Sequence, residues 1–276
     1  MRANHVKRRL EAGEPSIGTW LGLPSPESAE YVAALGFDWL TVDTEHNPID
    51  IRIASQMFGA IAGAGVAPMV RIPWNHPENF KRVLDAGAWG VVVPMVNSKE
   101  EAEMAVEATF FPPKGNRSVG GGMTGLRFDT SGGEYLKHAD DEILLVLQIE
   151  HIDAVERCDE ILGLPGVGAC FIGPNDMAAS MGIGLGVPLE GDHPRMIEAI
   201  AHVQKTAKAC GVAPGIHCSG AEGVNQRIDQ GFQFLAMASE LRYMVGGLAA
   251  GIASLNWTRS ERTMAGEAMA GGAVRY

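Results

Sequence analysis

The sequence predicts a closed (β/α)8 barrel of the TIM type. Short apolar runs rich in β-branched residues alternate with amphipathic segments eight times, within the roughly 250 residues that such a barrel needs. The chain has 276 residues, of which 46% are hydrophobic and 20% are charged, so it can bury one core as a single domain. No Gly-x-Gly-x-x-Gly pattern follows the first apolar run, which removes the main signal of a dinucleotide-binding sheet.

The eight expected strands are short and lie between helical segments. Strands are expected at residues 17–21, 37–42, 66–72, 90–93, 143–147, 167–172, 213–217 and 232–238. Helices are expected at 4–13, 25–36, from 50 onwards, at 77–86, at 98–109 and at 240–255. The Gly-rich run 118–125 is too long for a simple connection, and we interpret it as an active-site loop. We expect residues 1–257 to form the barrel domain and residues 258–276 to form a disordered tail.

Composition excludes several classes of partner. The net charge is −11, and no Lys/Arg-rich run contains interleaved aromatic residues, so neither nucleic acid nor an anionic membrane is an expected partner. The four cysteines have no zinc-binding spacing, and no run of 18 apolar residues occurs. The N-terminus is charged and has no apolar signal core. We therefore expect a cytoplasmic protein with reduced thiols.

Two carboxylates follow successive predicted strands. Glu150 stands just after one apolar run, and Asp176 ends the Gly-Pro-Asn-Asp segment after the next. The carboxyl ends of parallel strands share one rim, so both side chains are expected to face the same cavity. Two such oxygen ligands suit a hard divalent cation that keeps some of its waters. The alternative is that each carboxylate only caps the helix that follows it.

Other polar residues are expected at the same rim. The second strand is followed by Asp43, Glu45 and His46, and the third ends at Arg71. Arg71 can donate paired hydrogen bonds to an oxyanion, although an internal ion pair with Asp43 or Glu45 is the alternative. His46 among carboxylates is a candidate general base, and a structural cap is the alternative.

The lysines also restrict the chemistry. All seven fall outside the predicted strands, so none is positioned to form a Schiff base inside a barrel. Carbanion chemistry would then need a metal ion. A cation on Glu150 and Asp176, chelated by a 2-oxo acid, would stabilise an enolate, with Arg71 as a second electrophile at the keto oxygen.

Several long motifs resemble one family in the same order. They are DWLTVDTEHNP, PMVRIPWN, FKRVLDAGAWGVVVPMVNSKEEAE, FPPKGNRSVG, QIEHIDAVERCDEIL and GVGACFIGPNDMAASMG, and the resemblance as a whole covers about residues 5–257. They resemble the metal-dependent (class II) pyruvate aldolases, which act on 4-hydroxy-2-oxoheptanedioate and 2-keto-3-deoxy sugar acids. The resemblance implies reversible cleavage of a 4-hydroxy-2-oxo acid to pyruvate and an aldehyde, using Mg, Mn or Co. It also implies a hexamer built from dimers whose subunits exchange the final helix.

The resemblance further implies roles for individual residues. Glu150 and Asp176 match metal ligands, Arg71 matches the arginine at the keto oxygen, and His46 matches the general base. The supporting residues that it implies are Asp43 beside the base, Asp85 paired with the histidine, Gln148 in the pocket, and Gly173, Pro174 and Asn175 at the pyruvate carboxylate.

Departures from the family pattern fall on the aldehyde side. Gly125 stands where an arginine is usual, with Arg127 two residues later. His217-Cys218 replaces a more apolar segment, and Ser239-Glu240 stands where Ser-Asp is common. The runner-up functions are a malyl- or citramalyl-type lyase on the same scaffold and a non-catalytic binding barrel.

Overall fold

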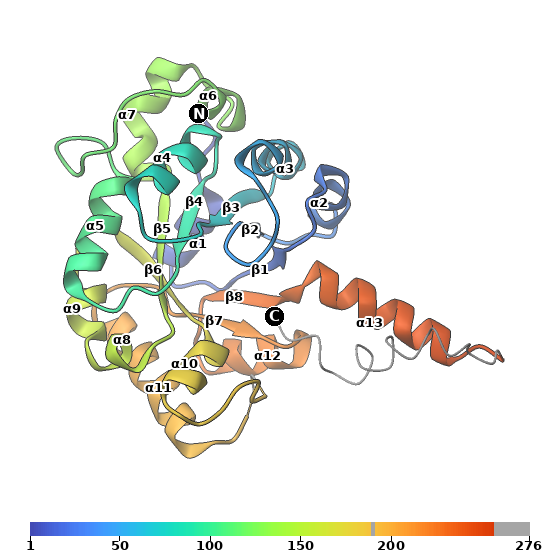
Figure 1. The fold of residues 1–276 in the computed structure, drawn as a ribbon. Helices are drawn as coiled ribbons and strands as arrows, with labels where there is room; N and C mark the ends of the chain where they lie inside the picture. Colours follow the sequence, from blue (N-terminus) through green and yellow to red (C-terminus); the bar gives the residue numbers. More distant parts are fainter. Residues whose placement is uncertain (189–190, 257–276) are drawn as a thin grey trace.

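The expected barrel is confirmed in a computed structural model, which describes residues 1–188 and 191–256. Eight parallel strands pair in sequence order, and the first also pairs with the last, so the sheet closes (Figure 1). The strands are β1 (Ser16–Leu21), β2 (Trp39–Asp43), β3 (Ala67–Arg71), β4 (Gly90–Val93), β5 (Leu144–Ile149), β6 (Val167–Ile172), β7 (Gly215–Cys218) and β8 (Phe234–Ser239).

Helices surround the closed sheet. They are α1 (His5–Glu11), α2 (Pro26–Ala33), α3 (Ile51–Gly63), α4 (Pro77–Asp85), α5 (Lys99–Thr109), α6 (Met123–Arg127), α7 (Gly132–Glu142), α8 (Ile152–Glu156), α9 (Cys158–Leu162), α10 (Pro174–Ser180), α11 (Pro194–Ala209), α12 (Ala221–Asp229) and α13 (Glu240–Ala253). Several begin where a side chain accepts a hydrogen bond from a free backbone N–H, as Ser25 does for α2 and Asp50 does for α3. Such caps define where the chain turns from the rim into each outer helix.

Aromatic rings fill the barrel interior. Trp39 of β2 and Phe234 of β8 are fully buried and stack with their ring centroids 4.2 Å apart. Gly18 on the intervening strand β1 makes this possible, because a Cβ at that position would lie 2.1 Å from the Trp39 ring. The core is therefore packed across the barrel and supports the rim from below.

The seventh strand begins later than its apolar run predicts. The run starts at Ala213, but β7 starts at Gly215, and Ala213 makes only an isolated bridge to Ala169. Pro214 has no N–H to donate to the ladder, although its carbonyl accepts from the Gln233 N–H at 2.8 Å.

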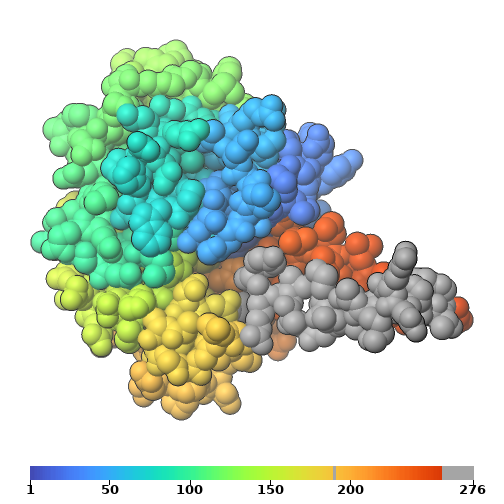
Figure 2. All heavy atoms as spheres, viewed as in Figure 1, coloured from blue at the N-terminus to red at the C-terminus, as the bar shows by residue number. Residues whose placement is uncertain are grey.

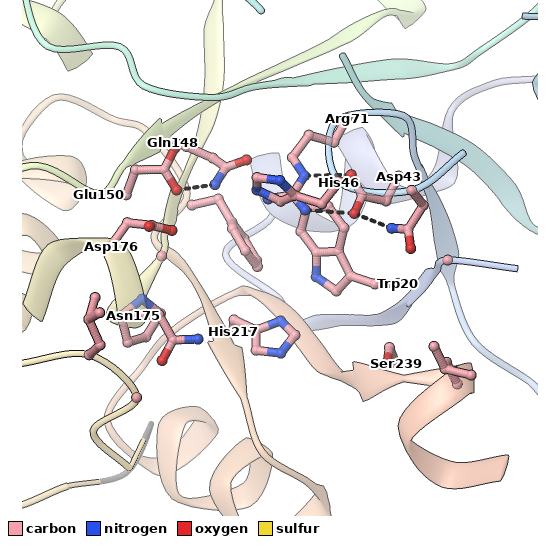
Figure 3. Close-up of a pocket in the computed structure, with 18 residues that line it drawn as sticks. Trp20, Asp43, His46, Arg71, Gln148, Glu150, Asn175, Asp176, His217 and Ser239 are labelled. Atoms are coloured by element: carbon pink, nitrogen blue, oxygen red, sulfur yellow. Dashed lines mark hydrogen bonds and ion pairs between the residues drawn. The ribbon is translucent and has the colours of Figure 1, made fainter. Parts of the chain in front are cut away.

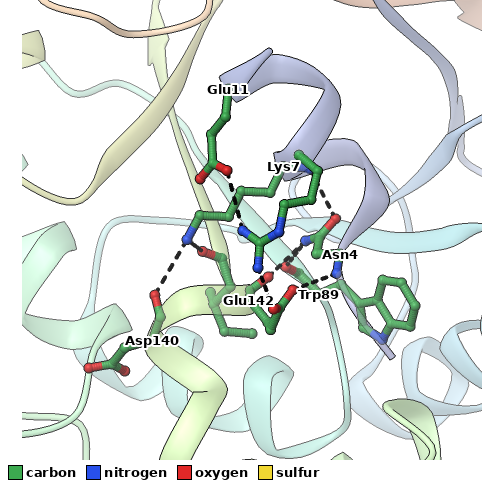
Figure 4. Close-up of polar contacts among 8 residues, drawn as sticks. Asn4, Lys7, Glu11, Trp89, Asp140 and Glu142 are labelled. Carbon is green, nitrogen blue, oxygen red and sulfur yellow. Dashed lines mark hydrogen bonds and ion pairs between the residues drawn. The ribbon is translucent and has the colours of Figure 1, made fainter. Parts of the chain in front are cut away.

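A buried hydrogen-bond network around Asn4 closes the amino end of the barrel (Figure 4). The Asn4 side-chain amide donates to the carbonyls of Trp89 (3.0 Å) and Glu142 (2.8 Å), and the Asn4 backbone N–H donates to the Glu142 carboxylate. Lys7 donates to the Asp140 and Ile143 carbonyls at the end of α7. This network gives hydrogen-bond partners to polar groups that would otherwise be buried without one at this end of the barrel.

The final helix, α13, projects from the rounded body of the barrel (Figures 1 and 2). Its first residue, Glu240, is its only buried one. Large apolar side chains are exposed along it: Tyr243 (49%), Met244 (45%), Leu248 (63%) and Ile252 (42%). The expected tail, residues 258–276, lies outside the described residues.

Candidate active site

Polar residues from six strand ends surround one cavity of about 550 Å³ (Figure 3). The predicted site residues that line it are Asp43, His46, Arg71, Gln148, Glu150, Gly173, Pro174, Asn175 and Asp176. They come from segments up to 133 residues apart, and the parallel barrel brings them together because each follows or ends a strand.

Arg71 is held by two carboxylates. Residues 43 and 71 are register partners on β2 and β3, and the guanidinium donates from Nε and Nη2 to the two Asp43 oxygens at 2.8 and 2.7 Å. Its Nη1 lies 3.1 Å from Glu45 Oε2, and its centre lies 4.5 Å above the Trp20 ring. Burial alone would raise the pKa of Asp43, but the hydrogen bonds and charge of Arg71 keep that pKa below its usual value. The expected internal ion pair exists, and it orients a guanidinium that also lines the cavity.

Glu150 is almost completely buried, with 4% of its surface exposed. Its oxygens accept from the Met95 backbone N–H at 2.8 Å and from the Gln148 side-chain amide at 2.5 Å. Met95 has a positive φ of 52°, a strained conformation for a non-glycine residue, and in it the N–H reaches the carboxylate. Burial raises the pKa of Glu150 to about 7, with Asp176 and Glu45 adding negative charge nearby.

Neither carboxylate of the predicted pair caps a helix. His151 is the N-cap of α8, and no side-chain hydrogen bond caps α10, where Asp176 lies in the first turn. Asp176 is solvent-exposed beside buried Glu150 on the wall of the cavity (Figure 3). Gly173 lets the chain pass close by, because a Cβ there would lie 2.6 Å from Glu150 Oε2.

The donor set fits a hard divalent cation. Three carboxylates but only one guanidinium are among the described residues that line the cavity, so it has an excess of negative charge. No group of three or more His, Cys, Asp or Glu side chains within the described ranges could hold a metal by itself. A cation on Glu150 and Asp176 would therefore take its other ligands from water or substrate, as Mg²⁺ commonly does.

His46 stands at the mouth of the cavity with 55% of its side chain exposed. Its Nε2 lies 3.5 Å from Glu45 Oε2. The neighbouring carboxylate of Asp43 is occupied by Arg71 and by the Asn47 amide, which donates to it at 2.6 Å. Glu45, and neither Asp43 nor Asp85, is thus the carboxylate next to the imidazole.

The expected pairing of Asp85 with His46 does not occur within one chain. Asp85 ends α4 just before β4 begins, which places it at the amino end of the barrel. Its Oδ1 accepts from buried Arg117 at 2.8 Å, and Arg117 also donates to the Tyr135 hydroxyl. Within its own chain Asp85 therefore binds Arg117, and the pairing of Asp85 with the histidine stays a prediction.

The Gly-rich run 118–125 also lies away from its own cavity. It follows helix α5 and precedes β5, whereas barrel active-site loops follow strands. A Cβ at Gly121 would lie 2.7 Å from the Asp85 side chain, and one at Gly125 would lie 2.7 Å from the Thr130 carbonyl. The interpretation of this run as an active-site loop of its own chain is therefore corrected.

Sequence reasoning missed part of the lining. Trp20 and Phe171 are buried strand residues whose rings also face the cavity, with their centroids 5.4 Å apart. Leu185 and Leu241 line it from loop and helix. Strand alternation marks Trp20 and Phe171 as interior residues, but nothing local distinguishes a barrel-core ring from one that meets a ligand.

Comparisons with known proteins agree with the class that the fold and site define, a lyase working at the carboxyl end of a (β/α)8 barrel. A family model described as HpcH/HpaI aldolase/citrate lyase matches residues 16–246, and the chain belongs to this family. The 4-hydroxy-2-oxo-heptane-1,7-dioate aldolase of Klebsiella pneumoniae is 38% identical over 247 residues, covering 90% of this chain and 92% of the relative.

Solved structures give the same result. A HpcH/HpaI aldolase/citrate lyase family protein from Burkholderia cenocepacia has a TM-score of 0.83 and 33% identity, covering 91% of this chain and 98% of its own. The HpcH/HpaI aldolase from Desulfitobacterium hafniense has a TM-score of 0.84 and 31% identity, covering 92% and 97%. The prediction of an aldolase, an enzyme of the lyase class, is confirmed, and the non-catalytic alternative is wrong. Enzymes of this family generally depend on a divalent metal. No helix in the described part of the chain could span a membrane.

Proposed function

We propose that this aldolase reversibly cleaves a 4-hydroxy-2-oxo acid to pyruvate, or a close 2-oxo-acid analogue, and an aldehyde. The observation that supports it most is the convergence of Glu150, Asp176, Arg71 and His46 on one cavity. Glu150 and Asp176 would hold the divalent cation, Mg, Mn or Co. When bound, this cation would supply positive charge that stabilises an enolate. The names of the relatives support the substrate class.

The protein's own groups divide the remaining work. Arg71, oriented by Asp43 and Glu45, donates to the keto oxygen where negative charge develops. Gln148 fixes Glu150, and the chain at Gly173, Pro174 and Asn175 receives the carboxylate of the 2-oxo acid. His46 takes the proton of the C4 hydroxyl as the C3–C4 bond breaks. The bonding electrons move to the 2-oxo half as its enolate, the aldehyde leaves, and a proton returns to C3 to give pyruvate.

The test is enolisation of pyruvate, followed by exchange of its methyl protons in deuterated buffer. We expect exchange that stops when a chelator is added and resumes when Mg, Mn or Co is returned. Exchange that continues in chelator would contradict the metal assignment. The runner-up is tested in parallel with malyl and citramalyl thioesters, and faster cleavage of those than of 4-hydroxy-2-oxo acids would favour it.

Arg71→Lys is expected to lower kcat by on the order of 100-fold or more, because a planar paired donor is replaced by a strongly hydrated ammonium group. Metal binding should persist, since Glu150 and Asp176 are unchanged. Steady-state cleavage at saturating metal measures the effect, with Arg242→Lys, an exposed position outside the lining, as the matched control. A Lys variant with near wild-type kcat would leave Arg71 only its ion-pair role.

We also infer a cytoplasmic homo-oligomer, expected to be a hexamer, in which α13 packs against another copy of the chain. The exposed apolar side chains of α13 support this, because a helix without a buried face gains little stability from its own chain. The four cysteines, which form no disulfide within the described chain, support the reducing compartment.

The wild-type protein should therefore remain an oligomer at micromolar concentration when measured by light scattering. Leu248→Glu together with Ile252→Glu should shift it to smaller species, because charges would enter the proposed contact. A monomeric wild type would contradict the proposal.

A further inference from the structure

The cavity extends beyond the residues proposed to hold the 2-oxo acid. Figure 3 shows His217 and Ser239 on the side away from Glu150. The surrounding walls are apolar: the Trp20 and Phe171 rings, Leu185 and Leu241. If the carboxylate pair and Arg71 receive the 2-oxo half, the aldehyde half lies against this second surface, which we call the acceptor end.

The charged side chains of the lining leave no positive charge to pair with a second carboxylate on the substrate. Asp43, Glu150 and Asp176 line it together with a single guanidinium, that of Arg71. A bound divalent cation would make this set neutral, and the carboxylate of the 2-oxo acid then adds one negative charge. Glu45, next to Arg71, contributes another. A second carboxylate on the aldehyde half would enter a site with no unmatched positive charge among the described lining residues, which is costly.

The histidine at the acceptor end does not supply that charge. Burial, together with the nearby positive charges of Arg71 and Arg242, lowers the pKa of His217 to about 4. At neutral pH the ring is an uncharged hydrogen-bonding group, and its centroid lies 6.2 Å from that of the Trp20 ring and 6.4 Å from that of the Phe171 ring. The Ser239 hydroxyl is the other neutral polar group there.

Arg127, which follows the expected position of the loop arginine by two residues, and Arg242 both lie outside this lining. Arg127 packs against α3 and α4, where it donates to the Ser55 carbonyl at 3.2 Å and fills the space over Gly59 and Gly87. Arg242 is exposed in the first turn of α13 and is not part of the lining. Neither closes the acceptor end with a positive charge.

We propose that the aldehyde released by this enzyme is uncharged and carries a hydroxyl group, so that its substrate is a monocarboxylic, hydroxylated 4-hydroxy-2-oxo acid. The inference rests on the proposed aldolase function and narrows it. It also separates this chain from relatives named for heptane-1,7-dioate, whose substrate carries a carboxylate at both ends. His217 is the residue that forms a hydrogen bond with this hydroxyl group, and the apolar walls exclude an aldehyde that carries a charge.

The test uses three 4-hydroxy-2-oxo acids of equal chain length that end in methyl, hydroxymethyl or carboxylate groups. Pyruvate release by the metal-loaded wild type should give the highest kcat/KM for the hydroxymethyl substrate. The carboxylate substrate should be lower by on the order of 100-fold, the scale of an unpaired buried charge. His217→Leu should reduce the hydroxymethyl-to-methyl preference by about tenfold, the scale of one good hydrogen bond, and His217→Gln should restore part of it.

Arg242→Gln is the matched control and should leave all three values unchanged. Cleavage of the carboxylate substrate as fast as the hydroxymethyl one would overturn the inference, as would an Arg242→Gln variant that selectively slows the carboxylate substrate. Either result would leave the aldolase function intact. Absence of pyruvate from all three, in protein shown by calorimetry to bind metal, would instead contradict the proposed function and this inference with it.

Discussion

Glu150→Gln and Asp176→Ala are each expected to abolish divalent-metal binding and nearly all cleavage activity. A hard cation with only two protein carboxylates has no redundancy, and the described chain offers no third ligand of that kind nearby. Calorimetric titration with Mn²⁺ measures the loss. Glu45→Gln is the control, because it removes a carboxylate that pairs with Arg71 and lies outside the lining. Wild-type affinity in either ligand variant would contradict the metal site.

The same Glu150→Gln change is expected to stabilise the metal-free protein at alkaline pH. The pKa of Glu150 is raised by burial to about 7 in the folded chain, from 4.5 when exposed. The folded state therefore binds the proton more tightly, and this carboxyl lowers the free energy of unfolding as pH rises through that window, by up to about 3 kcal/mol. Glutamine keeps the shape without the charge.

Thermal or urea unfolding in chelator should then find the variant more stable than wild type at pH 8 and equal to it near pH 4. Added metal should reverse the order at pH 8, because only the wild type gains binding free energy. If the variant and the wild type were equally stable at both pH values in chelator, burial of the Glu150 carboxylate would not lower the stability of the folded protein. Glu150 would thus be needed for activity while it lowers the stability of the metal-free protein, a trade-off that is common for buried carboxylates in active sites.

The barrel was predictable because each strand has a local signal. Residues 90–93 and 167–172 are continuous apolar runs, each preceded by a glycine-containing turn, and the observed strands have the same bounds. The placement of Glu150 and Asp176 on one cavity was predictable for the same reason, since both follow strands whose order defines a shared rim. The start of β7 was less accessible, because it depends on the missing N–H of Pro214.

Features set by three-dimensional packing were not predictable in this way. The motif around Asp85 predicts a partner for His46, yet the residue ends a helix at the amino end of the barrel. Which carboxylate stands beside His46 depends on Asp43 being taken by Arg71 and Asn47, a competition between neighbours that no spacing reveals. The lowered pKa of His217 likewise follows from its burial beside the rings of Trp20 and Phe171.

His46→Ala should slow C–C cleavage by roughly 10²- to 10⁴-fold, the usual scale of general-base catalysis. His46 stands at the cavity mouth with half of its side chain exposed and Glu45 3.5 Å from its Nε2, so it can meet a substrate hydroxyl without breaking a buried contact. Metal binding should survive, because Glu150 and Asp176 are untouched. Exchange of pyruvate methyl protons separates the steps, since it depends on the metal and Arg71 but not on deprotonation of the C4 hydroxyl.

The decisive measurement is kcat for cleavage against pH at saturating metal, normalised to metal occupancy. Only the neutral imidazole can accept the proton, so the wild-type rate should fall on the acid side, and that fall should disappear in His46→Ala. Saturating metal keeps protonation of Glu150 from producing the same limb. His76→Ala, an exposed histidine that caps α4 without a side-chain hydrogen bond, is the matched control and should keep both rate and profile. If His46→Ala instead loses thermal stability while its normalised rate stays near wild type, the imidazole is structural and another group removes the proton.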